Sequence, residues 1–142
     1  MPDTRDPRAA FIVEGIGPEE RIGDFGLVGG GAAGYELDRY DLLLGTPPSA
    51  LPLAYSEGHS DNYPHVGEEI FFNFPSMGGT MDFQVRADIT YFTTRNSGAV
   101  FSRASISSCG ALAHSDYDNN VSRMTANVLR RFMSDEPLPP VE

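Results

Sequence analysis

The sequence predicts an α/β fold with a small mixed sheet, a β-hairpin and a C-terminal amphipathic helix. Three observations predict it. Short apolar runs of strand length alternate with glycine and proline, a turn signal separates two strand-like segments near residue 96, and apolar residues recur at helical spacing near the C-terminus. Hydrophobic residues make up 40% of the 142-residue chain and charged residues 21%, which is ordinary for a protein with a buried core.

The first half of the chain predicts two buried strands and a short helix. Residues 9–13 form a compact apolar run closed by Gly15 and Gly17, which is typical of a buried strand. After a glycine-rich turn, residues 36–44 predict a short helix with its leucines on one side. The prolines at 47 and 48 end it, and residues 51–55 predict the next buried strand.

The second half carries the strongest local signals. Residues 66–74 are rich in phenylalanine and predict a strand or extended chain. Residues 87–94 and 99–106 flank Arg95-Asn96-Ser97-Gly98 and predict a hairpin, because Asn and Gly tolerate the positive φ angles of tight turns. Residues 119–133 predict an amphipathic helix capped by Asp118 or Asn119.

This order of elements predicts one domain over residues 9–133. Residues 1–8 are expected to be a flexible N-terminal segment, and the proline-rich tail over 134–142 is expected to be irregular. The strands are few for a complete doubly wound sheet. We therefore expect the sheet to be completed by polypeptide outside this sequence.

Charge and cysteine content exclude several classes of function. A net charge of −10 repels nucleic-acid phosphates and anionic lipids, so a small neutral substrate or another protein subunit is the expected partner. The single cysteine, Cys109, has no Cys/His neighbours at zinc-ligand or nucleophile spacing, and we expect it to have no catalytic role. No signal peptide and no membrane-spanning run is found, which predicts a cytoplasmic protein.

The glycine-rich run leaves three interpretations open. Gly29, Gly31 and Gly34 satisfy the Gly-x-Gly-x-x-Gly pattern of dinucleotide sites, with Glu57 as the acid that would bind the ribose. The preceding strand is broken, however, and the following helix is short. A plain tight turn is favoured over the dinucleotide-binding interpretation. The third interpretation is a glycine-rich loop that brings Gly34 and Glu36 close to a small ligand.

Four polar residues are candidates for a functional pocket. Glu36 is either a helix-start residue, which is the favoured reading, or a pocket acid/base. Glu57 and His59 follow a predicted strand, where ligands bind in α/β sheets, although an exposed polar turn is the commoner fate of such a string. Asn119 is either a cap of the terminal helix, which is the favoured interpretation, or a pocket residue at a helix start that faces a ligand. His65 and His114 are expected to be ordinary surface residues.

Long ordered strings in this chain resemble one family. They comprise DPRAAFIVEG (6–15), IGDFGL (22–27) running into GGGAAGYELDR (29–39), SEGHSD (56–61), and the stretches GAVFS (98–102), DNNVSR (118–123) and NVLRRF (127–132). Together they resemble the C-terminal region of the large (beta) subunit of N,N-dimethylformamidase and its relatives. The resemblance covers nearly the whole chain.

This resemblance implies part of an iron-dependent hydrolase that cleaves a small N-substituted formamide to an amine and formate. It implies a core like that of class I glutamine amidotransferases, without their cysteine nucleophile. Iron would be held by two tyrosines and a glutamate that lie upstream, so no metal ligand is assigned here. Glu36 would be the pocket acid/base, with Gly34, Glu57, His59 and Asn119 as substrate-pocket candidates.

The implied partners are the remainder of the large subunit, a small subunit and further copies in a homo-oligomer. Family subunits are several times longer than this sequence, so turnover is expected of the larger enzyme and not of this chain alone. The alternatives are a non-catalytic structural or interaction module of the same fold and, less favoured, a dinucleotide-binding domain.

Overall fold

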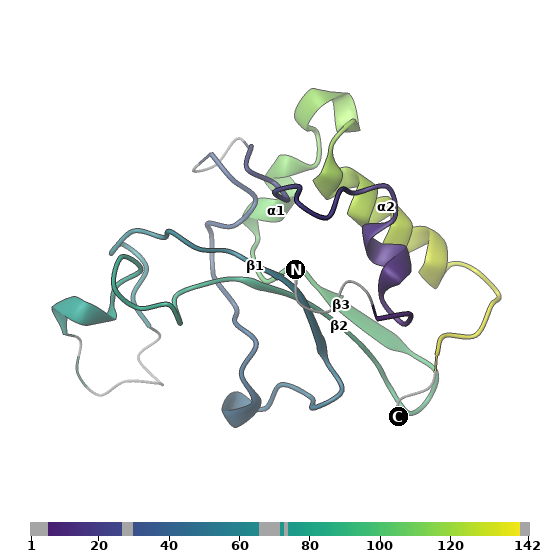
Figure 1. Cartoon of the computed structure of the whole chain (residues 1–142), viewed down its shortest axis with the longest axis horizontal. Helices are drawn as coiled ribbons and strands as arrows, with labels where there is room; N and C mark the ends of the chain where they lie inside the picture. Colours follow the sequence, from purple (N-terminus) through teal and green to yellow (C-terminus); the bar gives the residue numbers. More distant parts are fainter. Residues whose placement is uncertain (1–5, 27–29, 66–71, 73, 140–142) are drawn as a thin grey trace.

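The computed structural model describes residues 6–26, 30–65, 72 and 74–139, and these form a mixed α/β unit built on one antiparallel sheet. The strands β1 (Leu51–Tyr55), β2 (Asp88–Thr93) and β3 (Ala99–Ser102) lie in the order β1-β2-β3. Two helices follow them, α1 (Ser107–Ala111) and α2 (Asn120–Phe132). Figure 1 shows α2 beside the N-terminal segment, with the sheet below both.

The predicted hairpin is confirmed as β2 and β3. Thr93 pairs with Ala99, and the Thr94 backbone N–H donates to the Gly98 carbonyl at 2.8 Å. The left-handed φ of the turn falls on Ser97, at 61°, and not on its asparagine or glycine. β3 ends at Ser102, four residues earlier than predicted, because the chain turns at Ala104, where φ is 57°.

The predicted terminal helix is confirmed as α2. Asn119 caps it, since its side-chain oxygen accepts from the Ser122 N–H at 2.8 Å. The apolar face of α2 buries Met124 and Val128 against β1, β2 and the N-terminal segment. The buried members of this main core are Ala9, Ile12, Leu51, Leu53, Tyr91, Met124 and Val128.

The predicted strand over 9–13 is wrong, because those residues form a 3₁₀ helix, Ala10–Val13. The Asp6 carbonyl accepts from the N–H groups of both Ala9 and Ala10, which starts a helical turn. A five-residue apolar run is equally compatible with a strand and with one buried helical turn. Ile12 still enters the core, packed with α2, so the burial was predicted correctly and the backbone was not.

The predicted helix over 36–44 is also wrong over most of its length. Only Leu42–Leu44 form a 3₁₀ turn, capped by Asp41, and these leucines are exposed. The chain before it is held extended by the hairpin. The Asp38 N–H donates to the Ala104 carbonyl at 3.0 Å, and the Asp38 carbonyl accepts from the Asp88 N–H at 2.9 Å.

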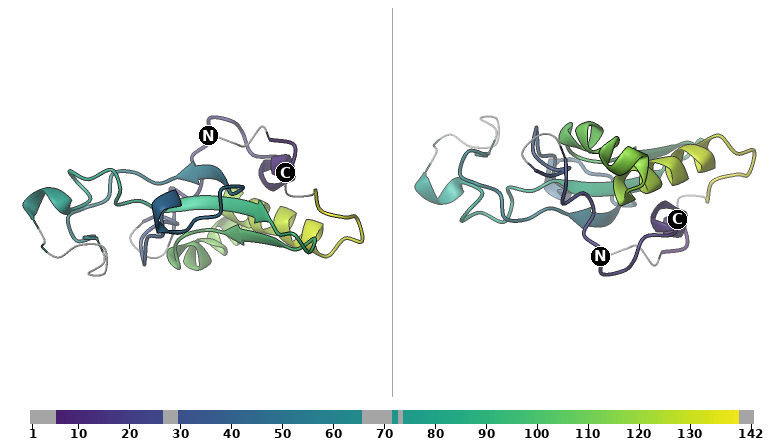
Figure 2. Two further views of the ribbon diagram at one scale, coloured as in Figure 1. Left: turned by 90° about the horizontal axis from the view of Figure 1, so that it is seen from below. Right: turned by 90° about the horizontal axis from the view of Figure 1, so that it is seen from above.

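A long segment between β1 and β2 projects away from the sheet, at the end opposite the hairpin turn (Figure 2). Most of the strand predicted over 66–74 lies outside the described residues. The described part exposes four large apolar side chains, Phe72, Phe74, Met81 and Phe83, each at least 60% accessible. We call its described residues, 57–65, 72 and 74–86, the projecting segment. It forms a wall of the larger cavity described below.

Candidate functional site

The turn around Gly34 is fixed to the start of α1 by side-chain hydroxyls. The Gly34 N–H donates to Ser105 Oγ at 3.0 Å, and the Tyr35 N–H donates to Ser107 Oγ at 2.8 Å. Ser105 Oγ in turn donates to the Tyr35 carbonyl at 2.8 Å. A Cβ at position 34 would lie 2.9 Å from Ser107 Oγ, so only glycine fits this approach. This turn sets the backbone position of Glu36, which follows Tyr35.

Glu36 lies in an exposed, strained position and not at a helix start. Its φ is 50°, and residues 35–41 contain no helix, so the helix-start interpretation is wrong. Left-handed φ in a residue other than glycine costs energy and persists where the surroundings enforce it, often at functional sites. The Glu36 side chain lines neither of the two cavities described below.

The dinucleotide interpretation loses its structural context. A helix must follow the third glycine of that motif, and none follows Gly34. The described strands are also all antiparallel, whereas the motif belongs to a parallel βαβ unit. Gly29, the first residue of the pattern, lies outside the described residues.

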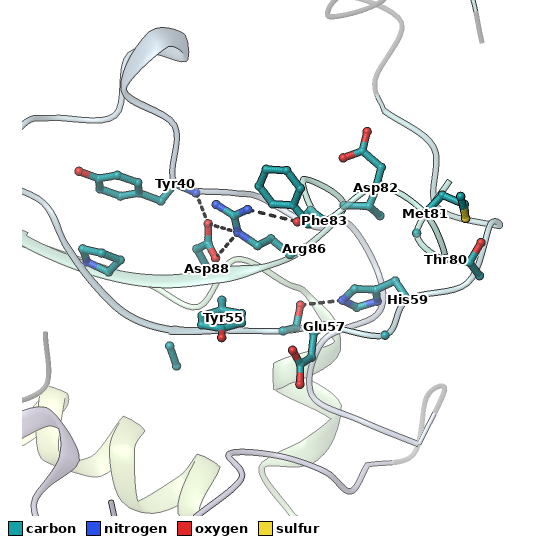
Figure 3. A pocket seen from close by; sticks show the side chains of 16 residues that line it. Tyr40, Tyr55, Glu57, His59, Thr80, Met81, Asp82, Phe83, Arg86 and Asp88 are labelled. Carbon is teal, nitrogen blue, oxygen red and sulfur yellow. Dashed lines mark hydrogen bonds and ion pairs between the residues drawn. The ribbon is translucent and has the colours of Figure 1, made fainter. Parts of the chain in front are cut away.

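The larger cavity, about 890 Å³, lies between the ends of β1 and β2 and the projecting segment (Figure 3). This volume is in the range of small-molecule sites. Its polar lining combines Asp88, Arg86 and Tyr40 on one side with His59 and Glu57 on the other.

Asp88 and Arg86 form a buried ion pair on the cavity wall. The Asp88 carboxylate is 4% exposed, accepts from Arg86 Nε at 2.9 and 3.0 Å, and accepts from the Tyr40 N–H at 2.6 Å. The Arg86 guanidinium also donates to the Phe83 carbonyl at 3.2 Å. Sequence reasoning missed this pair, although the two opposite charges are only two residues apart, just before β2 and at its first residue.

His59 and Glu57 line both cavities, and their role as substrate-pocket residues stays a prediction. His59 Nε2 lies 2.6 Å from Ser56 Oγ, which also accepts the Ala87 N–H at 2.8 Å. The ring meets Tyr63 edge-on, with centroids 5.3 Å apart. Burial lowers the pKa of His59, so its imidazole is neutral at pH 7. A neutral imidazole at a cavity wall is able to accept a proton or a hydrogen bond.

The second cavity, about 540 Å³, lies on the other side of the β1 end. Its walls come from residues 18–24, the turn at 31–33, and the sheet residues Ala54, Ala87 and Ile89. Its lining includes two arginines, Arg21 and Arg103. Sequence reasoning did not single out Arg103, because a lone arginine after a strand has no distinguishing pattern.

Asn119 is buried and engaged on every side-chain polar atom. Besides capping α2, its amide nitrogen donates to the carbonyls of Leu112 and His114 at 2.9 and 2.7 Å. Asn119, and not Asp118, is therefore the cap. It lines neither cavity, and neither does Gly34.

The two remaining histidines differ from one another. The prediction that His65 is an ordinary surface residue is wrong, because its side chain is 5% exposed and lies 3.0 Å from Asp82 Oδ2. His114 is exposed and stacks on Phe25 with ring centroids 4.3 Å apart.

Within the part of the chain that the structure describes, no three His, Cys, Asp or Glu side chains are grouped to hold a metal ion. Cys109 is exposed on α1 as a free thiol. None of the described helices is long and apolar enough to cross a bilayer.

Comparison with known proteins gives concordant matches. Residues 2–121 match the family described as N,N-dimethylformamidase beta subunit-like, C-terminal. The chain is 60% identical over 139 residues to the N,N-dimethylformamidase beta subunit of Paracoccus aminophilus, covering 98% of this chain and 18% of that subunit. The subunit of the same name from Alcaligenes sp is also 60% identical, over 141 residues, with 99% and 18% covered. The chain thus spans less than a fifth of the length of these relatives.

Proposed function

The chain belongs to the N,N-dimethylformamidase beta subunit-like, C-terminal family, and we propose that it is the C-terminal part of the large subunit of an amide hydrolase. Its substrate would be a small N-substituted formamide, cleaved to an amine and formate. The observation that carries this proposal is 60% identity over nearly the whole chain to subunits with that name.

Within this enzyme we assign proton transfer to Glu36. Hydrolysis adds water to the carbonyl carbon and breaks the C–N bond, so one proton leaves the water and one must reach the amine nitrogen. A carboxylate beside the reacting carbonyl performs both transfers. The fixed Gly34 turn and the left-handed φ of 50° at Glu36 support this role, because they fix the backbone from which the exposed side chain extends.

The exposure of Glu36 implies that the rest of its pocket comes from other polypeptide. More than four fifths of each relative lies outside the aligned segment, which is ample to supply that wall. We propose that Glu57 and His59 face the same substrate space from the end of β1, and that Gly34 and Asn119 hold the frame around it.

We propose that the iron implied by the resemblance is held by residues upstream of this chain. The described residues group no three His, Cys, Asp or Glu side chains, and we derive no step through the metal. The chemistry assigned to this chain is proton transfer by Glu36 and the shaping of the pocket.

The wider assembly is proposed on the same basis. The antiparallel sheet would be one part of a core like that of class I glutamine amidotransferases, completed by the remainder of the large subunit. A small subunit, further copies of the large one and a cytoplasmic location complete the proposal. A structure of the complete subunit tests it, and a sheet that ends at β1 and β3 there would contradict it.

The experiment for Glu36 is Glu36→Gln in the complete large subunit, with amine release from N,N-dimethylformamide as the assay. The expected result is a loss of kcat of about 10²-fold or more with a small change in KM, because glutamine keeps the shape but cannot carry the proton. Glu14→Gln is the matched control, since Glu14 is also an exposed glutamate but has an ordinary φ of −56° and no assigned role in the pocket. An unchanged rate for Glu36→Gln would reject the assignment and favour a non-catalytic module.

A further inference from the structure

The hydrogen bond between Ser56 and His59 determines which nitrogen of the imidazole carries the proton. Ser56 Oγ lies 2.6 Å from His59 Nε2, which is shorter than usual for an N–H donor and ordinary for an O–H donor. Ser56 Oγ also accepts the Ala87 N–H at 2.8 Å, so its own proton is free to be donated to the ring. Because Nε2 accepts from Ser56, the neutral imidazole carries its proton on Nδ1.

This Nδ1–H group is an unused donor that reaches open space. Among the described residues, the His59 side chain makes its one hydrogen bond through Nε2. The buried side-chain polar atoms without a partner there are Tyr91 Oη and Arg103 Nε, and His59 Nδ1 is not one of them. Nδ1 is therefore accessible, on a ring that lines the larger cavity opposite Arg86 and Asp88 (Figure 3).

The backbone that carries His59 is held against the other side of the projecting segment. A Cβ at Gly79 would lie 2.7 Å from both the His59 Cβ and the His59 carbonyl oxygen, so the two chains are in direct contact. Two residues further on, Asp61 Oδ1 accepts from the Thr80 N–H at 3.1 Å and from Thr80 Oγ1 at 2.5 Å. A donor fixed in this way loses little freedom when a ligand binds to it.

The cavity wall near His59 offers apolar surface to a ligand. Tyr55, Met81 and Phe83 line the cavity and are 60%, 72% and 79% exposed. Covering such surface is the main favourable contribution to most binding reactions. The ligand therefore needs an apolar body in addition to a group that meets the imidazole.

The charges of the lining favour a neutral ligand. Arg86 is already paired with Asp88, and the carboxylates of Glu57 and Asp82 add negative charge that repels an anion. An ammonium group is excluded at His59 Nδ1, because both groups are donors and neither can accept. A carbonyl oxygen meets the requirement, since it is uncharged and accepts hydrogen bonds.

We infer that the larger cavity binds a neutral carbonyl compound with an apolar body, whose oxygen accepts a hydrogen bond from His59 Nδ1–H. The cavity volume of about 890 Å³ admits ring-bearing amides, esters and ketones. The amide substrate of the proposed hydrolase belongs to this class, and for that ligand the inference rests on the proposed function. Binding by the 142-residue chain requires no hydrolysis, so it is tested separately.

The probe is N,N-dimethylbenzamide, whose carbonyl accepts hydrogen bonds and which has no N–H donor. Its Kd for the 142-residue chain is measured at pH 7 by NMR titration of the backbone amide shifts. N,N-dimethylbenzylamine has the same skeleton without the carbonyl and is a cation at this pH, and benzoate supplies the anion. We expect the amide to bind at least about threefold more tightly than either.

Two substitutions at His59 separate the donor from the shape of the ring. His59→Phe keeps an aromatic ring and loses the donor, so the Kd for the amide is expected to rise about threefold to tenfold, the range for one neutral hydrogen bond. His59→Gln keeps an N–H donor and is expected to bind more tightly than His59→Phe. His114→Phe is the matched control, because His114 is exposed and stacks on Phe25 outside the lining of the larger cavity, and it keeps the wild-type Kd.

A measurement on the unsubstituted chain does not depend on how the variants fold. The ¹⁵N shifts of an imidazole distinguish a protonated from an unprotonated ring nitrogen. For His59 we expect the proton on Nδ1 in the free chain and a further change of the Nδ1 shift as the amide saturates the site. The ring of His114 should show no such change.

The inference is overturned by a proton on Nε2, by the absence of saturable amide binding, or by equal amide affinity in wild type and His59→Phe. Binding of the cation or the anion as tightly as the amide would overturn it as well. None of these results bears on Glu36, whose role is tested by turnover in the complete subunit. Conversely, a fully active Glu36→Gln enzyme would leave the binding measurements unchanged.

Discussion

Gly23 donates its backbone N–H to the side-chain oxygen of Asn120 at 3.0 Å, joining the first part of the chain to the start of α2. The Asn120 amide nitrogen completes the junction by donating to Glu20 Oε1 at 2.7 Å and to the Arg21 carbonyl at 2.9 Å. One buried asparagine thus fixes the segment that walls the second cavity. Geometry at this cavity depends on a contact between residues 97 positions apart.

The first prediction concerns the fit at Gly23. A Cβ there would lie 2.3 Å from the Ala32 Cβ and 2.9 Å from Val121 Cγ2, at a φ of 67°. We expect Gly23→Ala to lower the free energy of unfolding by about 2–4 kcal/mol, from the clash and the backbone strain together. Gly45→Ala separates the two causes, because its φ is 100° but nothing lies within 4 Å, so a loss of only about 1 kcal/mol is expected. Urea denaturation measures both, and equal losses would contradict the packing argument.

The second prediction concerns the buried Asp88–Arg86 pair. Asp88→Ala leaves the Arg86 guanidinium and the Tyr40 N–H without their acceptor. We expect a loss of about 2–3 kcal/mol of unfolding free energy, below the full range for buried pairs because the Arg86 side chain is 22% exposed. The control is Asp118→Ala, which breaks an exposed pair with Arg123 and is expected to cost less than about 1 kcal/mol. Similar values for both would show that burial of Asp88 adds nothing.

The third prediction concerns pH. Burial lowers the folded-state pKa of His59 below its ordinary 6.5, so the unfolded chain takes up the proton first as pH falls. His59 therefore reduces stability as pH drops below about 6.5, and the reduction is complete once pH is below the folded pKa. We expect His59→Gln to flatten this part of the stability curve between pH 7 and 5. The same slope in wild type and variant would contradict the burial effect.

The fourth prediction separates stability from activity at Glu36. Glycine adopts a φ of 50° without strain, so Glu36→Gly is expected to keep or raise the free energy of unfolding, by up to about 1 kcal/mol. The same substitution should abolish hydrolysis in the complete subunit. Glu14→Gly is the matched control, because φ there is −56° and glycine brings only its entropy cost of about 0.5–1 kcal/mol. A clear loss of stability in Glu36→Gly would mean that the backbone there is not strained.

Local signals were sufficient where the backbone depends on near neighbours. The periodicity of α2, the turn before β3 and the apolar run of β1 each predicted the right element. They failed where distant contacts decide. Residues 36–41 have the composition of a helix, but Asp38 bonds to β2 and to the turn after β3, which holds the chain extended.

The candidate site divides in the same way. Glu57 and His59 were pocket candidates from their place after a strand, with an exposed polar turn as the favoured interpretation; both line the larger cavity, and their role in substrate binding stays a prediction. Arg103 and the Arg86–Asp88 pair escaped notice, because their importance comes from burial, and burial of a charged side chain leaves no mark in a single sequence. The helix cap was predicted as Asp118 or Asn119, and it is Asn119; its two further bonds to carbonyls were not predicted.

The exposed apolar side chains of the projecting segment have a consequence for handling the isolated polypeptide. Association between copies is favoured by the exposed apolar side chains Phe72, Phe74, Met81 and Phe83. The net charge of −10 opposes it, because copies of the chain repel one another in dilute buffer. Added salt screens that repulsion and leaves the apolar attraction in place. The isolated polypeptide should therefore remain free of aggregates at low ionic strength and aggregate as the salt concentration is raised.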